Sequence, residues 1–159
     1  MLTRAERTEL INRIRQLPAK VEAVVNRLSD EQLDTPYRKD GWTVRQVVHH
    51  LADSHMNAFI RVKLLLTEEK PTLKPYDQDK WAMLADTART PIASSLAILR
   101  GVHERWSVLF QNVSDAGWGR SGMHPETGVV TVEGLLSSYA GHGDNHLKQI
   151  TGLIAEKGW

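Results

Sequence analysis

The sequence predicts an all-α protein, a four-helix bundle that forms one domain over residues 1–159. Apolar residues recur at helical spacing through four long segments. Helix start and stop signals stand at the ends of these segments, and the chain is long enough for one substantial hydrophobic core. Hydrophobic residues make up 41% of the chain and charged residues 25%, which is the balance of a globular protein rather than a disordered one.

The first helix is expected to begin after Thr3, because Thr3 and Glu6 have the spacing of a capping box. Pro18 lies within this segment and is expected to kink or split the helix near Leu17, because proline removes a helical hydrogen bond. Residues 29–40 are expected to form a short turn followed by an extended arm.

The second long helix is expected over residues 43–67, opened by a capping box between Thr43 and Gln46. Prolines then interrupt the chain, and a short helix is expected at 77–84. This connection is long for neighbouring helices, and long excursions at the end of a bundle often carry functional residues.

The third long helix is expected to have Pro91 in its first turn and to end near Val113. A small hairpin or looped excursion is expected over residues 119–131, where Pro and Gly occur together. The last helix is expected over residues 131–157, with Gly158 as its C-terminal cap.

The composition excludes several classes of protein. The chain contains no Cys, which excludes disulfide scaffolds, Cys-based zinc sites and thiol nucleophiles. Lys plus Arg number 20 and Asp plus Glu 19, so the formal net charge is +1 and no basic surplus indicates a nucleic-acid partner. No apolar run reaches the roughly 20 residues of a membrane helix, and the charged N-terminus is unlike a signal peptide. We therefore expect a cytoplasmic protein with no nucleic-acid and no membrane partner, and leave a homodimer open.

Three of the seven histidines are predicted to form a metal site. His142 and His146 stand four residues apart on the apolar face of the last helix, so their side chains are neighbours that converge on one point. His50 lies at the edge of the apolar face of the second long helix, at the head of a polar stripe. One ligand from one helix and an i, i+4 pair from another indicate a site for one divalent metal ion. Zinc or nickel is the first expectation, and cobalt and iron(II) also accept such ligands. The alternative is that these are ordinary histidines hydrogen-bonded to their neighbours.

The other four histidines are expected to have structural roles. His55 and His103 lie on apolar faces and are expected to be hydrogen-bonded core residues, with contact to a ligand histidine as the alternative for His55. His49 is expected to make a structural contact. His124 lies in the excursion near the mouth of the bundle, where it is either solvated or faces the site.

The segment 142–146, HGDNH, lacks the general base of zinc peptidases. It has the two histidine positions of the H-E-x-x-H motif, but Gly143 replaces the glutamate and Asp144 is expected to point away from the ligand face. A peptidase is therefore not expected. Asp53, one turn from His50, is a candidate to orient an imidazole or accept a proton, and a surface position is the alternative.

Residues 41–57, GWTVRQVVHHLADSHMN, resemble the signature of the DinB/YfiT-like superfamily. More narrowly, the chain resembles the YfiT-type metal-dependent hydrolases, also called bacillithiol transferases, over most of its length. The resemblance implies a four-helix bundle with up-down-down-up connections and one divalent metal held by three histidines, here His50, His142 and His146. Further matching stretches are 33–38, 74–77, 99–106, 124–126 and 139–146.

Positions beside the last two ligands depart from the family pattern. Members often carry a Trp before the first of these histidines and further histidines between and after them. The departure leaves the three ligands in place and alters the pocket wall, so it bears on the substrate rather than on the metal. The residues at these places are Gly141, Asp144, Asn145, Lys148 and Gln149.

The resemblance and the histidine pattern together indicate a metal-dependent enzyme. Our first hypothesis is an S-transferase that activates a low-molecular-weight thiol of the bacillithiol type for attack on an electrophile. Arg45, Arg61 or Lys63 would then bind carboxylates of the thiol. The alternatives are a hydrolase that activates water at the same site and a non-catalytic metal-binding module.

Overall fold

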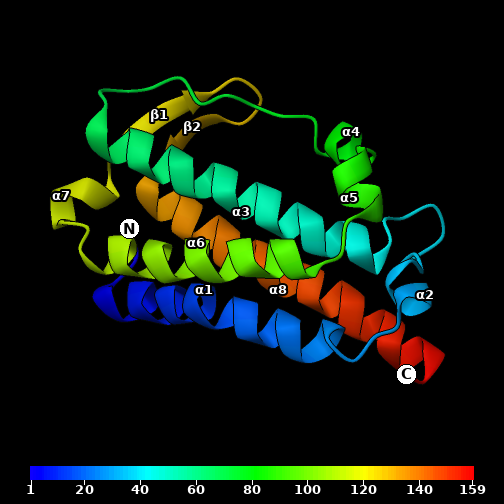
Figure 1. Ribbon diagram of the computed structural model, residues 1–159. Helices are drawn as coiled ribbons and strands as arrows, with labels where there is room; N and C mark the ends of the chain where they lie inside the picture. The colour runs from blue at the N-terminus through cyan, green and yellow to red at the C-terminus, as the bar shows by residue number, and fades with distance from the viewer.

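The structure, a computed structural model, describes residues 1–159. It is built on four long helices, α1 (Arg4–Val25), α3 (Val44–Thr67), α6 (Ala93–Gln111) and α8 (Val132–Lys157). α1 packs against α6 and α8, and α3 packs against the same two helices. Figure 1 shows α1 and α8 running in one direction and α3 and α6 in the other, so the predicted four-helix bundle is confirmed with its up-down-down-up order. None of the helices has the length and apolarity that a membrane-spanning helix requires.

Two clusters of buried apolar side chains lie at different heights along the bundle. The helix segments between them carry His55 on α3, His103 on α6 and His142 on α8. Three histidines, of which His55 and His103 are buried, therefore occupy a layer between two apolar layers, and these apolar layers fix the four helices on both sides of it. The first cluster draws on residues 17–33, 44–52, 92–99 and 150–154, and the second on 11–14, 58–73, 106–118 and 132–140.

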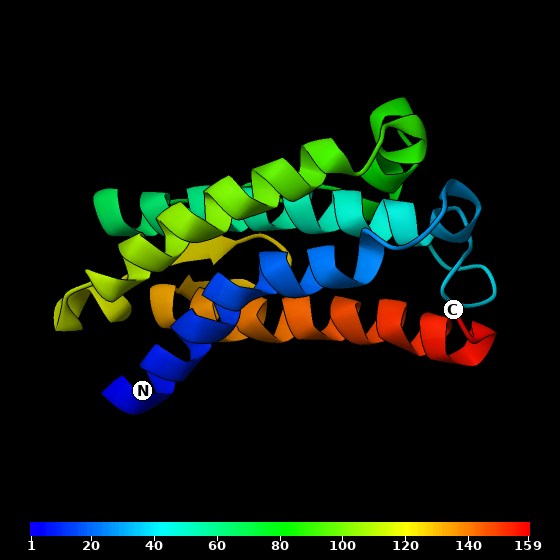
Figure 2. The ribbon, with the colours of Figure 1, turned by 60° about the horizontal axis from the view of Figure 1, so that its bottom comes forward.

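Pro18 kinks α1 without splitting it. α1 stays helical through Pro18, and Figure 2 shows its N-terminal part turned away from the direction of its C-terminal part. Proline has no backbone N–H, so the carbonyl of Ile14, one turn earlier, loses its helical donor. Of the two outcomes expected for this position, the structure has the kink.

The segment after α1 contains a helical turn that the sequence analysis did not predict. In α2 (Asp30–Leu33), the Ser29 hydroxyl accepts from the backbone N–H of Gln32, and the Gln32 side chain accepts from the backbone N–H of Ser29. The expectation of a plain turn is wrong here because this reciprocal cap stabilises one turn of helix. The expected extended arm follows, and Pro36 forms an antiparallel bridge with Thr43.

The connection from α3 to α6 returns along the bundle and contains two short helices, α4 (Gln78–Ala82) and α5 (Ala85–Arg89). The expectation of one short helix over 77–84 is therefore only half right. Both short helices pack against α3, and the side-chain amide of Gln46 donates to the carbonyl of Ala82 at 2.8 Å. The crossover is thereby tied to the part of α3 that precedes the histidines.

The third long helix differs from its expected bounds at both ends. α6 begins at Ala93, so Pro91 lies just before the helix rather than in its first turn. It ends at Gln111, and a further short helix, α7 (Asp115–Trp118), follows. The sequence analysis missed α7, which the Ser114 hydroxyl caps by accepting from the backbone N–H of residue 117.

The predicted hairpin before the last helix is confirmed. β1 (Ser121–His124) pairs antiparallel with β2 (Gly128–Thr131). The crossover adds to it, because the N–H of Leu73 donates to the carbonyl of Met123 at 2.8 Å. α8 (Val132–Lys157) ends at the predicted C-terminal cap, Gly158, whose φ of 69° is left-handed.

Candidate metal centre

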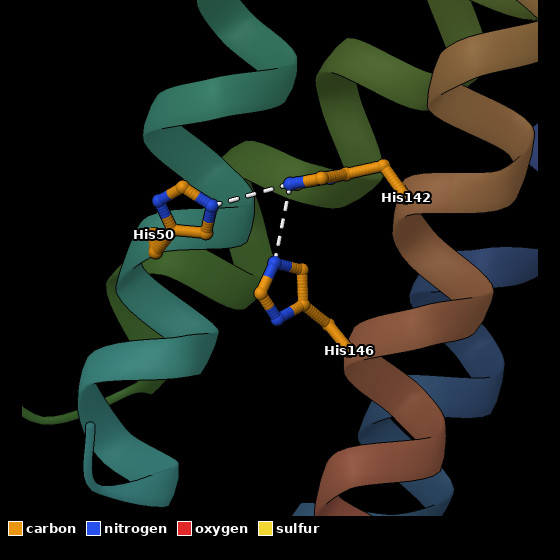
Figure 3. Close-up of side chains that lie close together, drawn as sticks. All are labelled: His50, His142 and His146. Atoms are coloured by element: carbon orange, nitrogen blue, oxygen red, sulfur yellow. Dashed lines mark hydrogen bonds between the residues drawn. The ribbon is translucent and has the colours of Figure 1, made fainter. Parts of the chain in front are cut away.

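Three imidazole rings converge inside the bundle (Figure 3). His50 projects from α3, and His142 and His146 project from adjacent turns of α8. The Nε2 atom of His142 lies 3.2 Å from Nε2 of His50 and 3.1 Å from Nε2 of His146. The structure thus brings together the three histidines that the sequence pattern selected.

Two of the three nitrogen spacings match those around a single metal ion, and all three candidate ligand atoms lie within 4.8 Å of one another. Zinc binds histidine nitrogen at about 2.0–2.1 Å, which places two ligand atoms of a tetrahedral ion about 3.3 Å apart. Nδ1 of His146 lies 2.8 Å from the side-chain oxygen of Gln149, so Nδ1 donates and Nε2 offers a lone pair. No carboxylate joins the group. An ion held by these three rings would therefore keep a position free for a further ligand.

Burial favours the neutral form of all three rings. Burial, together with the rings of His146 and His142, lowers the pKa of His50 to about 3. Burial and the His146 ring lower the pKa of His142 to about 3. Burial also lowers the pKa of His146, and its hydrogen bond to Gln149 opposes that shift. Neutral imidazole is the form that binds a metal, so the rings are in the binding form at neutral pH.

Helix α1 packs against the turn of α8 that carries His142 and His146. Gly143 lies against Leu17, and a Cβ atom at this position would overlap that side chain. Asp144 accepts from the guanidinium of Arg13 at 2.5 and 3.0 Å, so it points away from the ligand face as predicted. Gly143 therefore serves close helix packing, whereas Gly141 faces open space.

His55 and His103 are buried core histidines, as the sequence analysis expected, and His55 also contacts a residue of the triad. Nδ1 of His55 lies 2.8 Å from Nε2 of His103. Nε2 of His55 lies 3.0 Å from Nδ1 of His142. His55 is therefore both a hydrogen-bonded core histidine and in contact with a histidine of the triad, which was the alternative predicted for it.

The remaining candidates lie outside the triad. His49 contacts the Ser95 hydroxyl at 2.7 Å and the carbonyl of Thr90 at 3.0 Å, which is a structural role. His124 is buried on β1 and lines a cavity beside the centre. Asp53 makes no side-chain hydrogen bond to any of the three rings; burial and the charge of Asp86 raise its pKa.

Two cavities meet at the centre. The smaller, of about 360 Å³, is lined by all three histidines and by Trp42, whose ring centroid lies 4.6 Å from that of His50. The larger, of about 960 Å³, is bounded by the crossover, the hairpin and α8, and reaches the centre through His142. Gln78 at the start of α4 also lines both cavities.

Of the crossover side chains in these walls, Tyr76 and Asp77 belong to the stretch 74–77 that resembles the family, but no role was predicted for them or for Gln78. The other signal was the length of the connection between the second and third long helices. They reach the cavities because the crossover folds back over α3. No local sequence pattern predicts that the crossover packs in this way.

Of the three cations considered as carboxylate ligands, only Arg61 lines a cavity. Arg45 is buried and donates to Asp34 and Asp30 at 2.6 and 2.8 Å, so that expectation is wrong. Lys63 is exposed over the ring of Phe59. Arg61 donates one bond to the carbonyl of residue 74 and keeps further donors for a ligand.

The sequence of this chain is similar to those of known proteins over nearly its full length. The sequence model of the DinB superfamily matches residues 13–150. A protein of Oceanobacillus iheyensis, whose printed name is "Putative metal-dependent hydrolase", is 48% identical over 95% of this chain and 87% of its own length. YfiT of Bacillus subtilis, with the same descriptive name, is 43% identical over 99% of this chain and 89% of its own length.

Solved structures agree with the sequence comparisons. The structure of Bacillus subtilis YfiT, described as a four-helix bundle of unusual topology, superposes with a TM-score of 0.98 over 100% of this chain and 91% of that chain. A second four-helix bundle protein, 18% identical, superposes with a TM-score of 0.64 over 92% of this chain and 98% of its own, and supports the fold alone.

Proposed function

This chain belongs to the DinB superfamily, and from that premise we propose that it is a metal-dependent enzyme in which His50, His142 and His146 hold one divalent cation, zinc or nickel. We propose further that it is an S-transferase, which activates a low-molecular-weight thiol of the bacillithiol type for attack on an electrophile. It would act in the cytoplasm, where small thiols are kept reduced.

The observation that carries this proposal is the meeting of three Nε2 atoms at the wall of a cavity, with no fourth protein ligand. Structural zinc sites are closed by four protein ligands, and catalytic sites use three and leave one position open. The non-catalytic module ranks lower for this reason.

The acidity of the two candidate nucleophiles favours a thiol over water. A bound divalent cation lowers the pKa of a thiol from about 8.5, or that of water from about 15.7. The thiol needs much the smaller shift. Asp40 and Asp79 line the smaller cavity, but neither is hydrogen-bonded to a ring of the triad. In the transfer, the thiol sulfur bonds to the electrophilic carbon, the leaving group departs with its electron pair, and the thiol proton passes to solvent.

Two adjoining cavities suit a reaction with two substrates. The smaller cavity opens directly onto the three rings, and the larger reaches them at His142. Arg61 lines the larger cavity and would bind a carboxylate of the thiol there. The electrophile would then approach through the smaller cavity.

The test begins with protein purified without an affinity His-tag. We expect about one zinc or nickel per chain by elemental analysis, and loss of the metal in His142→Ala. The loaded protein, a thiol and chlorodinitrobenzene should give a conjugate faster than the same mixture with His142→Ala. His49→Ala is the matched control, because His49 is a buried histidine of the same helix as His50 that lies outside the triad. No conjugate above background with any common cellular thiol would refute the transferase.

A hydrolase at the same centre is the second candidate, favoured by the printed names of the relatives. It uses the same three ligands with water in the open position. Turnover of ester or lactone substrates without added thiol, lost in His142→Ala, would support it over the transferase.

A further inference from the structure

A chain of hydrogen bonds runs from a backbone carbonyl of α1, through His103 and His55, to His142 of the candidate metal centre. The carbonyl oxygen of Ile14 lies 2.5 Å from Nδ1 of His103, and Nε2 of His103 lies 2.8 Å from Nδ1 of His55. Nε2 of His55 then lies 3.0 Å from Nδ1 of His142. Three histidines from three helices are thus linked, and in each link Nε2 of one ring faces Nδ1 of the next.

Pro18 explains why this chain of hydrogen bonds can start at Ile14. In an uninterrupted helix the carbonyl of residue 14 accepts from the N–H of residue 18, which proline lacks. A buried carbonyl without a donor is costly, and Nδ1 of His103 supplies the donor. The kink in α1 therefore gives this chain of hydrogen bonds its fixed end.

The direction of every bond follows from that end. A carbonyl oxygen only accepts, so Nδ1 of His103 carries the proton, and burial lowers the pKa of His103 to about 4, which leaves its Nε2 as an acceptor. Nδ1 of His55 must then donate, and its Nε2 accepts in turn. The donor left to complete the chain of hydrogen bonds is Nδ1 of His142, whose Nε2 is free to offer its lone pair.

We infer that His103 and His55 are positioning residues, which hold His142 in the Nδ1-protonated tautomer and in the ring orientation that metal binding through Nε2 requires. This inference rests on the proposed function, because it presumes that His142 is a metal ligand. It gives a role to two buried histidines that contact neither the substrate nor the metal in the proposed reaction.

The rings of His55 and His103 are almost completely buried among aromatic side chains. His55 is 0% exposed and His103 is 1% exposed. The ring of Trp106 stands edge-on to both rings at 5.9 Å, and Tyr139 stands edge-on to His55 at 5.1 Å. His103 also borders a cavity of about 410 Å³ that charged side chains of α1 and α6 line, but both of its ring nitrogens are already hydrogen-bonded. Hydrogen bonds between such buried rings fix orientation strongly.

The test uses His103→Leu, which removes the acceptor for His55, and His103→Gln, whose side-chain oxygen can accept the same bond. Loss of a partner that orients a ligand typically costs 10–100-fold in metal affinity. We expect zinc affinity, measured by competition with a chromophoric chelator, to fall by about that factor in His103→Leu and to recover largely in His103→Gln. His49→Gln, the matched buried control, should leave zinc affinity within about twofold of the wild type.

Nuclear magnetic resonance of the ring nitrogens supplies a readout that does not depend on metal. We expect His103, His55 and His142 of the metal-free wild type to be Nδ1-protonated, and His142 in His103→Leu to become a mixture of tautomers. Nε2 protonation of His55 or His103 in the wild type would overturn the inference even if His103→Leu fails to fold. Unchanged zinc affinity in a folded His103→Leu would overturn it as well.

The two proposals fail in different ways. If the wild type binds no zinc or nickel at the triad, the proposed function fails, whatever the tautomers are. If the wild type binds zinc through the triad and His103→Leu binds it equally well, only the positioning role is lost.

Discussion

Gly143 of α8 lies directly against Leu17 of α1, in the turn between the two α8 histidines of the triad. Leu17 is 2% exposed, so it has no room to move aside. We expect Gly143→Ala to lower the free energy of unfolding by about 1–3 kcal/mol, the usual cost of overpacking a core. Urea unfolding measures this loss. A shift of α8 would also displace His142, so zinc affinity should fall.

Gly141, two residues earlier, provides the matched control. A Cβ atom there meets nothing within 4 Å. Gly141→Ala should therefore raise the free energy of unfolding by up to about 1 kcal/mol, because alanine favours a helix interior over glycine. Equal losses of stability in the two variants would show that the contact with Leu17 is not what requires glycine at 143.

Arg61 and Lys63 make a second matched pair on α3. Arg61 lines the larger cavity, and Lys63 is exposed outside it. We expect Arg61→Met to raise the KM for a carboxylate-bearing thiol about tenfold, the cost of a charge-assisted hydrogen bond, with little change in metal content. Steady-state kinetics with Lys63→Met should match the wild type. Identical KM values for all three proteins would remove Arg61 from thiol binding.

The stability of the metal-free protein should depend on pH through His103. Burial lowers the pKa of His103 to about 4, against its hydrogen bond to Ile14, which acts in the opposite direction. The unfolded chain takes up this proton near pH 6.5. The free energy of unfolding should therefore fall as pH drops from about 6.5 towards 4, because the unfolded state binds more protons there.

The size of this effect is on the order of 3 kcal/mol for His103 across that window. His50 and His142, with pKa values of about 3, add losses of the same sign. Urea unfolding in the presence of a chelator, repeated between pH 4.5 and about 7.5, measures the slope. His103→Gln should have a shallower slope, and a slope equal to that of the wild type would contradict the assignment.

The three histidines of the triad could be selected from the sequence because the position of each on its own helix depends only on local spacing. A spacing of four puts His142 and His146 on one helix face whatever the tertiary structure, and the apolar period placed His50 at the core edge of its own helix. The capping box at Thr43 likewise fixed where that helix begins. The convergence of His50 with the other two rings depends on helix rotation, so the sequence alone left it as a hypothesis.

The short helices other than α4, and the hydrogen bonds that link the histidines, were not predictable for two reasons. α2, α5 and α7 have four or five residues each, too few for a hydrophobic period to appear. The contact of His55 with His103 joins residues 48 apart, and it exists only because α3 and α6 pack at that height. Helical periodicity identifies buried faces, but it does not say which buried polar group meets which.

The contact between Trp42 and His50 offers a direct signal of metal binding at the triad. The two ring centroids lie 4.6 Å apart, so an ion bound to His50 would be close to the indole. An open-shell ion such as Ni²⁺ quenches a nearby excited indole, and closed-shell Zn²⁺ does not. We expect nickel titration to reduce tryptophan fluorescence with a one-to-one endpoint and zinc titration to leave it nearly unchanged.

Trp42→Phe should abolish most of this quenching while leaving nickel stoichiometry at one per chain. Trp106 is separated from the triad by His55, and energy or electron transfer to the ion weakens steeply with distance. His142→Ala should remove the quenching together with the nickel. Full quenching in Trp42→Phe would mean that nickel binds elsewhere on the chain and not to the three histidines of the triad.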